Sequence, residues 1–353
     1  MVRRVVFLLA VMVVGFLSYR AVEAQATALS TIASTDYDRN GKADLTVFRP
    51  GEGRFYVEQA PNFNTAFAID SASATARTDF ILPPNDYNAD GAVDSALYRP
   101  TTVGSAALAG TWTITLGPTF NTSTSVVWGG ATGDKPLPAD WDGNGSVDVA
   151  VYRPAERKLY VLQGPNFNSA FTIGPFGLPG DSPEPADWDG DGKTDFAVWR
   201  PSERRIYVLQ AGSAAAPFST AFAFNFGTAT QTLLAGDYDG DGRIDLAGFT
   251  ATPQANNWLF IQGGTNFSTM FALTWGFTGD IPCPGDWDGD GKLDVAVYRP
   301  AEGRFYVLQQ GASGSSKYST AFSNAWGITT DVPISARNPQ PQQNATNTAL
   351  ATF

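Results

Sequence analysis

Short runs of apolar residues alternate with polar turns along this chain, and the same order of runs returns about every 50 residues. Each unit opens with an Asp-rich loop, first seen at Asp36 to Asp44. A run that ends in an aromatic residue, Arg and Pro follows, as in Phe48-Arg49-Pro50. Three further runs, the last containing Pro, lead to the next loop. Short runs of this kind between Gly- and Pro-rich turns predict β-strands, and the absence of a 3.6-residue period favours an all-β fold.

The Asp loop recurs six times, and successive loops start 50, 54, 47, 50 and 49 residues apart. Four short strands in each repeat are typical of one blade of a β-propeller. We therefore predict a propeller of six four-stranded blades, with seven blades as the alternative. The six repeats start near residues 28, 78, 132, 180, 230 and 279, and the first residues of the loops are Asp36, Asp86, Asp140, Asp187, Asp237 and Asp286.

The predicted propeller covers residues 25–335. A seventh unit starts at Asp331-Val332-Pro333 but contains no Asp loop. We expect residues 331–335 to form a closing strand, because a ring that joins its two ends loses its exposed sheet edges. Residues 336–353 are rich in Pro, Gln, Asn, Thr and Ala, a composition that predicts a flexible C-terminal tail.

The N-terminus has the layout of a secretory signal peptide. Arg3 and Arg4 precede an apolar run from Val5 to Leu17, and small residues around Ala24 follow. A membrane anchor is the alternative, but the run is shorter than the roughly 20 residues of a spanning helix. We predict a signal peptide at residues 1–24, a secreted or cell-surface protein, and no membrane span after cleavage.

Two absences limit the chemistry. Cys283 is the only cysteine, so no internal disulfide can form, and an exported chain needs another source of stability. The sequence contains no histidine, which excludes Ser-His and Cys-His catalysis and zinc sites that depend on imidazole.

The Asp loop follows the pattern Asp-x-[Asp/Asn]-x-[Asp/Asn]-Gly-x-x-Asp, and we number its places one to nine. Oxygen-bearing side chains at alternate places converge when the loop curls, and Gly at place six permits the bend. Calcium prefers six to eight hard oxygen ligands. An EF-hand would close with Glu at place twelve, but that place is apolar or Gly here: Val47, Leu97, Val151, Val198, Gly248 and Val297.

The loop and its flanking strands resemble the FG-GAP/VCBS-type repeat of bacterial secreted proteins and of the integrin α-subunit propeller. The resemblance covers nearly all of residues 28–335. It implies a calcium loop between the first two strands of each blade, with side-chain ligands at places one, three, five and nine and a carbonyl ligand at place seven. The implied ligands are Asp36, Asp38, Asn40, Lys42, Asp44, Asp86, Asn88, Asp90, Ala92, Asp94, Asp140, Asp142, Asn144, Ser146, Asp148, Asp187, Asp189, Asp191, Lys193, Asp195, Asp237, Asp239, Asp241, Arg243, Asp245, Asp286, Asp288, Asp290, Lys292 and Asp294.

Charge supports about six Ca²⁺ ions per chain. The loops hold 21 of the 34 acidic residues, and the formal net charge is −11. Removal of residues 1–24 would leave a net charge of −13, and six divalent cations would add +12 and offset nearly all of it. The first two loops depart from the pattern, with Arg39 or Ala89 in place of Gly at place four. Asn40, Asn88 and Asn144 lower the charge of the first three loops, so we expect these loops to bind more weakly.

The acids outside the loops argue against catalysis. Most of them recur at equivalent places, and these are Glu52, Glu156, Glu203, Glu302, Asp79, Asp134, Asp181, Asp280 and Asp331. Outside the signal peptide, Glu58, Asp70 and Glu184 are the acids that do not recur, whereas a glycosidase or lyase needs a differentiated cluster. We predict that the chain is not an enzyme, with a polysaccharide-active enzyme as a remaining alternative. Lys and Arg form no basic patch, so nucleic acid is not an expected partner.

The leading hypothesis is a binding or adhesion module for a glycan or protein partner, which rests on fold analogy. The alternative is a structural or self-assembling protein of the cell envelope. The irregular segments are the candidate ligand sites. They are the insertion from Thr101 to Gly110, the altered fifth repeat from Thr250 to Asn257, and the Asn-Phe-Asn loops at Asn62 and Asn166.

Overall fold

The computed structural model describes residues 35–71, 79–100, 110–212, 218, 220–251, 257–310, 318–335 and 342–343. The chain divides into the units Met1–Ile32 and Ala33–Phe353, and all described residues belong to the second unit. The predicted signal peptide at residues 1–24, and all of the predicted tail except 342–343, lie outside the described residues. Within the described ranges, no helix combines the length and apolar character needed to cross a membrane.

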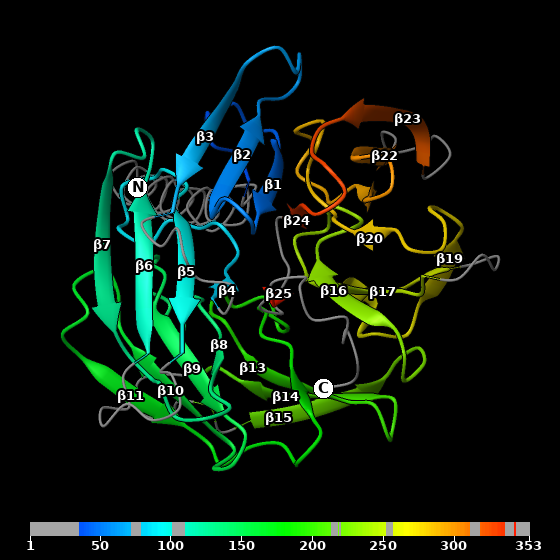
Figure 1. Ribbon diagram of the computed structural model, residues 1–353. Coiled ribbons are helices and arrows are strands. Elements are labelled where there is room, and N and C mark those ends of the chain that lie inside the picture. Colours follow the sequence, from blue (N-terminus) through cyan, green and yellow to red (C-terminus); the bar gives the residue numbers. More distant parts are fainter. Residues whose placement is uncertain are drawn as a thin grey trace, which may run out of the picture. The chain divides into compact units, whose positions relative to one another are not determined.

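The described residues of the second unit form six antiparallel sheets, and most of their strands are labelled in Figure 1. The prediction of an all-β propeller with six four-stranded blades is confirmed. In order from the first strand to the fourth, the blades are β24 (Val332–Ile334), β1 (Leu45–Arg49), β2 (Arg54–Glu58) and β3 (Ala66–Asp70); β4 (Phe80–Ile81), β5 (Ser95–Arg99), β6 (Thr111–Leu116) and β7 (Thr122–Val127); β8 (Lys135–Pro136), β9 (Val149–Arg153), β10 (Lys158–Leu162) and β11 (Ala170–Ile173); β12 (Ser182–Pro183), β13 (Phe196–Arg200), β14 (Arg205–Gln210) and β15 (Thr220–Asn225); β16 (Thr232–Gly236), β17 (Asp245–Phe249), β18 (Trp258–Ile261) and β19 (Met270–Leu273); and β20 (Ile281–Pro282), β21 (Val295–Arg299), β22 (Arg304–Gln310) and β23 (Tyr318–Ala325).

The first blade joins the two ends of the propeller. Its first strand, β24, comes from the C-terminal part of the chain and pairs antiparallel with β1, with Val47 opposite Pro333. This pairing decides for six blades rather than seven. A short fifth strand, β25 (Gln342–Gln343), pairs with β4 at the edge of the second blade. The described residues also include one 3₁₀ turn, η1 (Gly263–Thr265).

Burial changes from strand to strand across a blade. In the third blade, the first four residues of β9 are fully buried, β10 alternates buried and half-buried residues, and β11 is largely exposed. The second strand of a blade therefore reads as a continuous apolar run, because neighbouring blades cover both of its faces. The hydrophobic clusters lie between blades. One of them combines Trp188 and Ile206 of the fourth blade with Leu246 and Ile261 of the fifth.

The turn between the third and fourth strands adds an aromatic anchor between blades. Phe267 of the fifth blade stacks on Phe224 of the fourth, with ring centroids 3.9 Å apart and planes 3° apart. Phe63 of the first blade contacts Phe322 of the sixth in a tilted arrangement, with ring centroids 5.7 Å apart. Phe167 packs into the cluster between the second and third blades. The two Asn-Phe-Asn loops thus use their central Phe for blade packing.

The recurring Arg residues pair with the recurring Asp residues inside each blade. Arg153, at the end of β9, donates from Nε to Asp134 Oδ1 at 2.8 Å and from Nη2 to Oδ2 at 3.1 Å. The same pair recurs as Arg49 with Asp331, Arg99 with Asp79, Arg200 with Asp181 and Arg299 with Asp280. The fifth blade has Gln231 and Thr250 at the two places, so it lacks both partners together.

Candidate metal centres

In five blades the Asp loop joins the first strand to the second, whereas in the first blade it precedes β1 and the first strand is β24. In every blade the last carboxylate of the loop fixes it to the blade. In the sixth loop, Asp294 Oδ2 accepts the backbone N–H of Trp287 at 3.1 Å. Asp294 Oδ1 accepts the N–H of Gln310, at the end of β22, at 2.8 Å. Equivalent bonds tie place nine of the other five loops to the turn after the third strand. All six place-nine carboxylates are buried.

The first carboxylate organises the curl of the loop. Asp286 Oδ1 accepts the N–H of Gly289 at 2.7 Å and that of Asp290 at 3.1 Å, and Oδ2 accepts the N–H of Gly291 at 2.9 Å. Gly291, at place six, has a φ of +86°, a conformation that favours glycine. Hydrogen bonds to its own Asp side chain therefore hold the backbone of the loop in its curl, and these bonds do not involve an ion.

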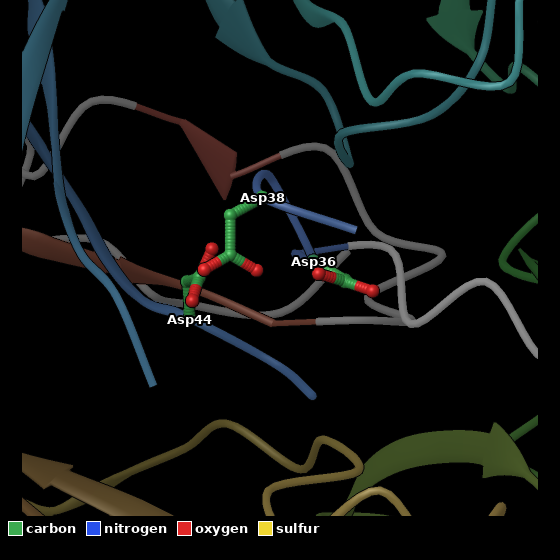
Figure 2. A group of neighbouring side chains, drawn as sticks. All are labelled: Asp36, Asp38 and Asp44. Atoms are coloured by element: carbon green, nitrogen blue, oxygen red, sulfur yellow. The ribbon is translucent and has the colours of Figure 1, made fainter. Parts of the chain in front are cut away.

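Carboxylates converge in five of the six loops. In Figure 2 the side chains of Asp36, Asp38 and Asp44 of the first loop lie close together. One oxygen from each lies within 4.8 Å of the others. The corresponding groups in the other loops are Asp140, Asp142 and Asp148; Asp187, Asp189 and Asp195; Asp237, Asp239 and Asp245; and Asp286, Asp288 and Asp290. The second loop, where Asn88 replaces the carboxylate at place three, has no such group among its described residues.

Burial makes these carboxylates costly to ionise without a cation. It raises the pKa of Asp294 to about 8 and that of Asp44 to about 7, and nearby loop carboxylates raise both further. Backbone hydrogen bonds oppose this shift only in part. Burial also raises the pKa of Asp286, at place one, to about 6. A bound divalent cation would relieve the burial cost and the mutual repulsion.

The donor set suits a hard cation. The loops offer carboxylate, amide and carbonyl oxygens, and they contain no Cys or His. Such ligands suit calcium, magnesium or manganese rather than zinc or copper. The residues present therefore fit the ion that the sequence suggests. Their assignment as ligands stays a prediction.

Glutamine at the end of the third strand is a loop partner that sequence reasoning missed. Gln210 Nε2 donates to Asp189 Oδ2 at 2.6 Å, and Gln163 and Gln262 make the same bond to Asp142 and Asp239. The signal was visible in the sequence, because a Gln stands at the end of the third strand, or directly after it, in five of the six repeats. These side chains hold the place-three carboxylate against its own blade.

Asparagine at place five links the loop to the same turn. Asn40 Nδ2 donates to the carbonyl of Ala60 at 2.7 Å, and its Oδ1 accepts the N–H of Lys42 at 2.9 Å. Asn144 makes the matching pair of bonds in the third loop. An Asn at this place thus supplies an amide donor where an Asp would add negative charge.

Comparison with known protein families supports the repeat. The family model described as the FG-GAP-like repeat matches residues 140–198 and 187–248, which include the third, fourth and fifth Asp loops. No curated protein shows significant similarity to the sequence. A crystal structure of a protein from Lactobacillus plantarum is 11% identical with a TM-score of 0.44, and covers 82% of this chain and 98% of its own. A putative 6-phosphogluconolactonase from Bacteroides fragilis is 9% identical with a TM-score of 0.40, and covers 83% of this chain and 96% of its own.

The second of these names contradicts the prediction that the chain is not an enzyme, and that exclusion is withdrawn. Its physical basis was too narrow. The absence of histidine excludes only mechanisms that need imidazole, and carboxylate, tyrosine and arginine side chains can also transfer protons or stabilise charge. A likeness at 9% identity carries neither a reaction nor a substrate to this chain.

Proposed function

Because this chain is an FG-GAP-repeat β-propeller, we propose that it is a secreted calcium-binding module that recognises a glycan or a protein partner. The fold supports a binding module. The observation that carries the calcium assignment is the convergence of three carboxylates in five loops, at places one, three and nine in four of them and at places one, three and five in the sixth. Secretion rests on the sequence of residues 1–24 alone.

Calcium fits these loops better than magnesium does. Calcium accepts six to eight oxygens in flexible geometry, whereas magnesium demands a near-ideal octahedron and retains several waters. A nine-residue loop with up to four carboxylates and a carbonyl at place seven offers the larger set. A bound ion would supply positive charge that cross-links places one, three and nine. It would thereby hold the start of the second strand in a protein that has no disulfide.

Calorimetric titration of chelator-treated protein tests this assignment. We expect about six calcium ions per chain, with the fourth, fifth and sixth loops binding most tightly because each offers four carboxylates. Magnesium at the same concentration is the matched control and should bind more weakly. A stoichiometry of one or two calcium ions would contradict the assignment and leave most loops as empty acidic turns.

The partner remains to be identified by experiment. Two of the irregular segments, Thr101 to Gly110 and Thr250 to Asn257, fall mostly on residues 101–109 and 252–256, outside the described ranges. A glycan array probed with calcium and again with chelator is the direct test. Calcium-dependent hits on one glycan class would support the binding proposal. Filaments or sheets in micrographs, with no glycan bound, would favour self-assembly instead.

A further inference from the structure

Neighbouring Asp loops are bonded to one another through the backbone. The N–H of Leu293, at place eight of the sixth loop, donates to the carbonyl of Asp237, at place one of the fifth, at 2.8 Å. The N–H of Ala43 in the first loop donates to the carbonyl of Asp286 in the sixth at 2.7 Å. The same bond joins the third loop to the second and the fourth to the third. In all four cases place eight of one loop donates to place one of the preceding loop around the ring.

Side-chain contacts link neighbouring loops in the same direction around the ring. The place-seven Lys or Arg of one loop lies over the place-four Gly of the preceding loop. A Cβ added to Gly240 would lie 2.7 Å from Lys292 Cε, and one added to Gly143 would lie 2.6 Å from Lys193 Cγ. The pair Gly289 and Lys42 is nearly as close, at 3.2 Å. Arg243 covers Gly190 more loosely, at 3.9 Å.

The size of the place-four residue complements the size of its neighbour. Arg39 and Ala89 occupy place four of the first two loops with φ of 63° and 59°, so the backbone there does not require glycine. The loops that follow them carry the small residues Ala92 and Ser146 at place seven. The four loops with Gly at place four are followed by Lys or Arg. Glycine at this place therefore makes room for the long side chain of the next loop.

We propose that the six loops act as one coupled ring, in which an ion in one loop raises the affinity of its neighbours for calcium. The inference rests on the proposed calcium sites. In the proposed site the Lys292 carbonyl is a ligand of the ion in its own loop, and Lys292 Nζ donates to Asp290 of that loop at 3.1 Å. The stem of the same side chain packs over Gly240 of the fifth loop, and the next N–H donates to the Asp237 carbonyl. An ion that fixes Asp237 thus also fixes the orientation of the Lys292 carbonyl. Such coupling is reciprocal between the two sites.

Terbium, which occupies calcium sites and luminesces when a nearby tryptophan is excited, can report on the sixth loop. Trp287 stands at place two of that loop, whereas Tyr238 holds this place in the fifth. A Trp287→Phe protein supplies the background signal. Asp239→Asn in the fifth loop should weaken terbium binding at the sixth loop by roughly fivefold or more. Asp142→Asn in the third loop makes the same change of charge without adjoining the sixth loop, and should have little effect.

A double-mutant cycle separates the proposed contact from general damage. Gly240→Ala should weaken terbium binding at the sixth loop, because its methyl group displaces the Lys292 side chain. Lys292→Ser should weaken it too, but the double variant should be no worse than either single one, since it reproduces the natural pair Ala89 and Ser146. Lys292→Arg should preserve the affinity, as Arg243 already packs over Gly190.

Gly242→Ala is the matched control, because Gly242 has a φ of +82° and no atom within 4 Å of an added Cβ. Its effect should add in full to that of Lys292→Ser. The coupling would be overturned if the effects of Gly240→Ala and Gly242→Ala both added in full to that of Lys292→Ser. It would also be overturned if Asp239→Asn left terbium binding at the sixth loop unchanged. A wild-type chain that binds neither calcium nor terbium would overturn the proposed function itself.

Discussion

In most blades, the two ends of the second strand handle buried negative charge in opposite ways. At its start, three carboxylates of the Asp loop converge in five blades, and where Lys292 forms an ion pair in the sixth loop it contacts one carboxylate of the group, Asp290. At its end, one buried carboxylate receives two N–H bonds from one guanidinium, as Asp181 does from Arg200. The charge of Asp is therefore neutralised within the fold at the end of the strand. At the start of the strand, it depends on the calcium and the pH of the solution. Calcium, pH and substitutions should therefore act on the two ends differently.

Removal of calcium should have the largest effect, and should act on the loop end alone. An ion that binds only the folded state adds about 2.7 kcal/mol per site at a hundredfold excess over its dissociation constant. Chelation should therefore lower the melting temperature by many degrees and open the loops to protease. Calorimetry and limited proteolysis, each with and without chelator, measure this. An unchanged melting temperature would show that the loops do not stabilise the fold through calcium.

Loss of an Arg at the other end should be the next largest effect and should not depend on calcium. Arg200→Leu leaves the buried Asp181 without its guanidinium and removes a cation–π contact with Tyr207 at 4.3 Å. We expect a loss of roughly 3 kcal/mol in the free energy of unfolding, equal with calcium and with chelator.

Arg200→Thr combined with Asp181→Gln sharpens this test. The pair reproduces Thr250 and Gln231 of the fifth blade, and it removes the charge together with its partner. The double variant should be more stable than Arg200→Thr alone. If the double variant were less stable than Arg200→Thr alone, the pairing of Arg with Asp would not explain why the fifth blade lacks both residues.

Substitution at place one should separate the two roles of the loop Asp residues. Asp286→Ala removes the acceptor of three backbone N–H groups as well as a predicted ion ligand, whereas Asp286→Asn keeps an oxygen acceptor. In chelator, the Ala variant should be less stable than the Asn variant by about 1–2 kcal/mol. With calcium present, both should be less stable than wild type and cut first in the sixth blade. Equal stability of the two variants in chelator would mean that these bonds do not hold the loop.

The smallest effect is the dependence of the calcium-free protein on pH. Burial raises the pKa of Asp195 and Asp245 to about 7 and that of Asp94 to about 6, above the ordinary value of 3.8. A raised carboxyl pKa gives stability that is complete below the unfolded pKa and is lost as the pH rises through the folded value. In chelator, the melting temperature should therefore fall as the pH rises from about 4 to about 7. The stabilisation by added calcium should grow over the same range, and a calcium effect independent of pH would contradict this.

The repeat made the blades predictable from sequence, since six copies of one pattern fix the order of strands and the position of each Asp loop. Contacts between repeats were not predictable, because spacing within a repeat says nothing about which residue of the next repeat touches it. The match of Gly143 with Lys193 became visible only when the third and fourth loops were placed side by side. Phe267 was unexpected for the same reason, as its stacking partner Phe224 belongs to another blade.

Function was the least predictable part. Counting acids that break the repeat suggested that catalysis was absent, but equivalent places in six blades can have different neighbours. Glu184 illustrates this, as it is buried at a place where the third blade has Leu137 and the sixth has Cys283. A sequence shows that such a residue is unusual and does not show what surrounds it.

The pairing of β24 with β1 has a consequence for the timing of folding during synthesis. The first blade lacks its first strand until Val332–Ile334 has been made, although β1, β2 and β3 are among the earliest strands to be made. Until then one edge of β1 stays open, and an open strand edge can pair with another chain. The ring can therefore close only after Val332–Ile334 has left the ribosome. A chain truncated before Val332 would keep that edge open permanently and would be prone to aggregate.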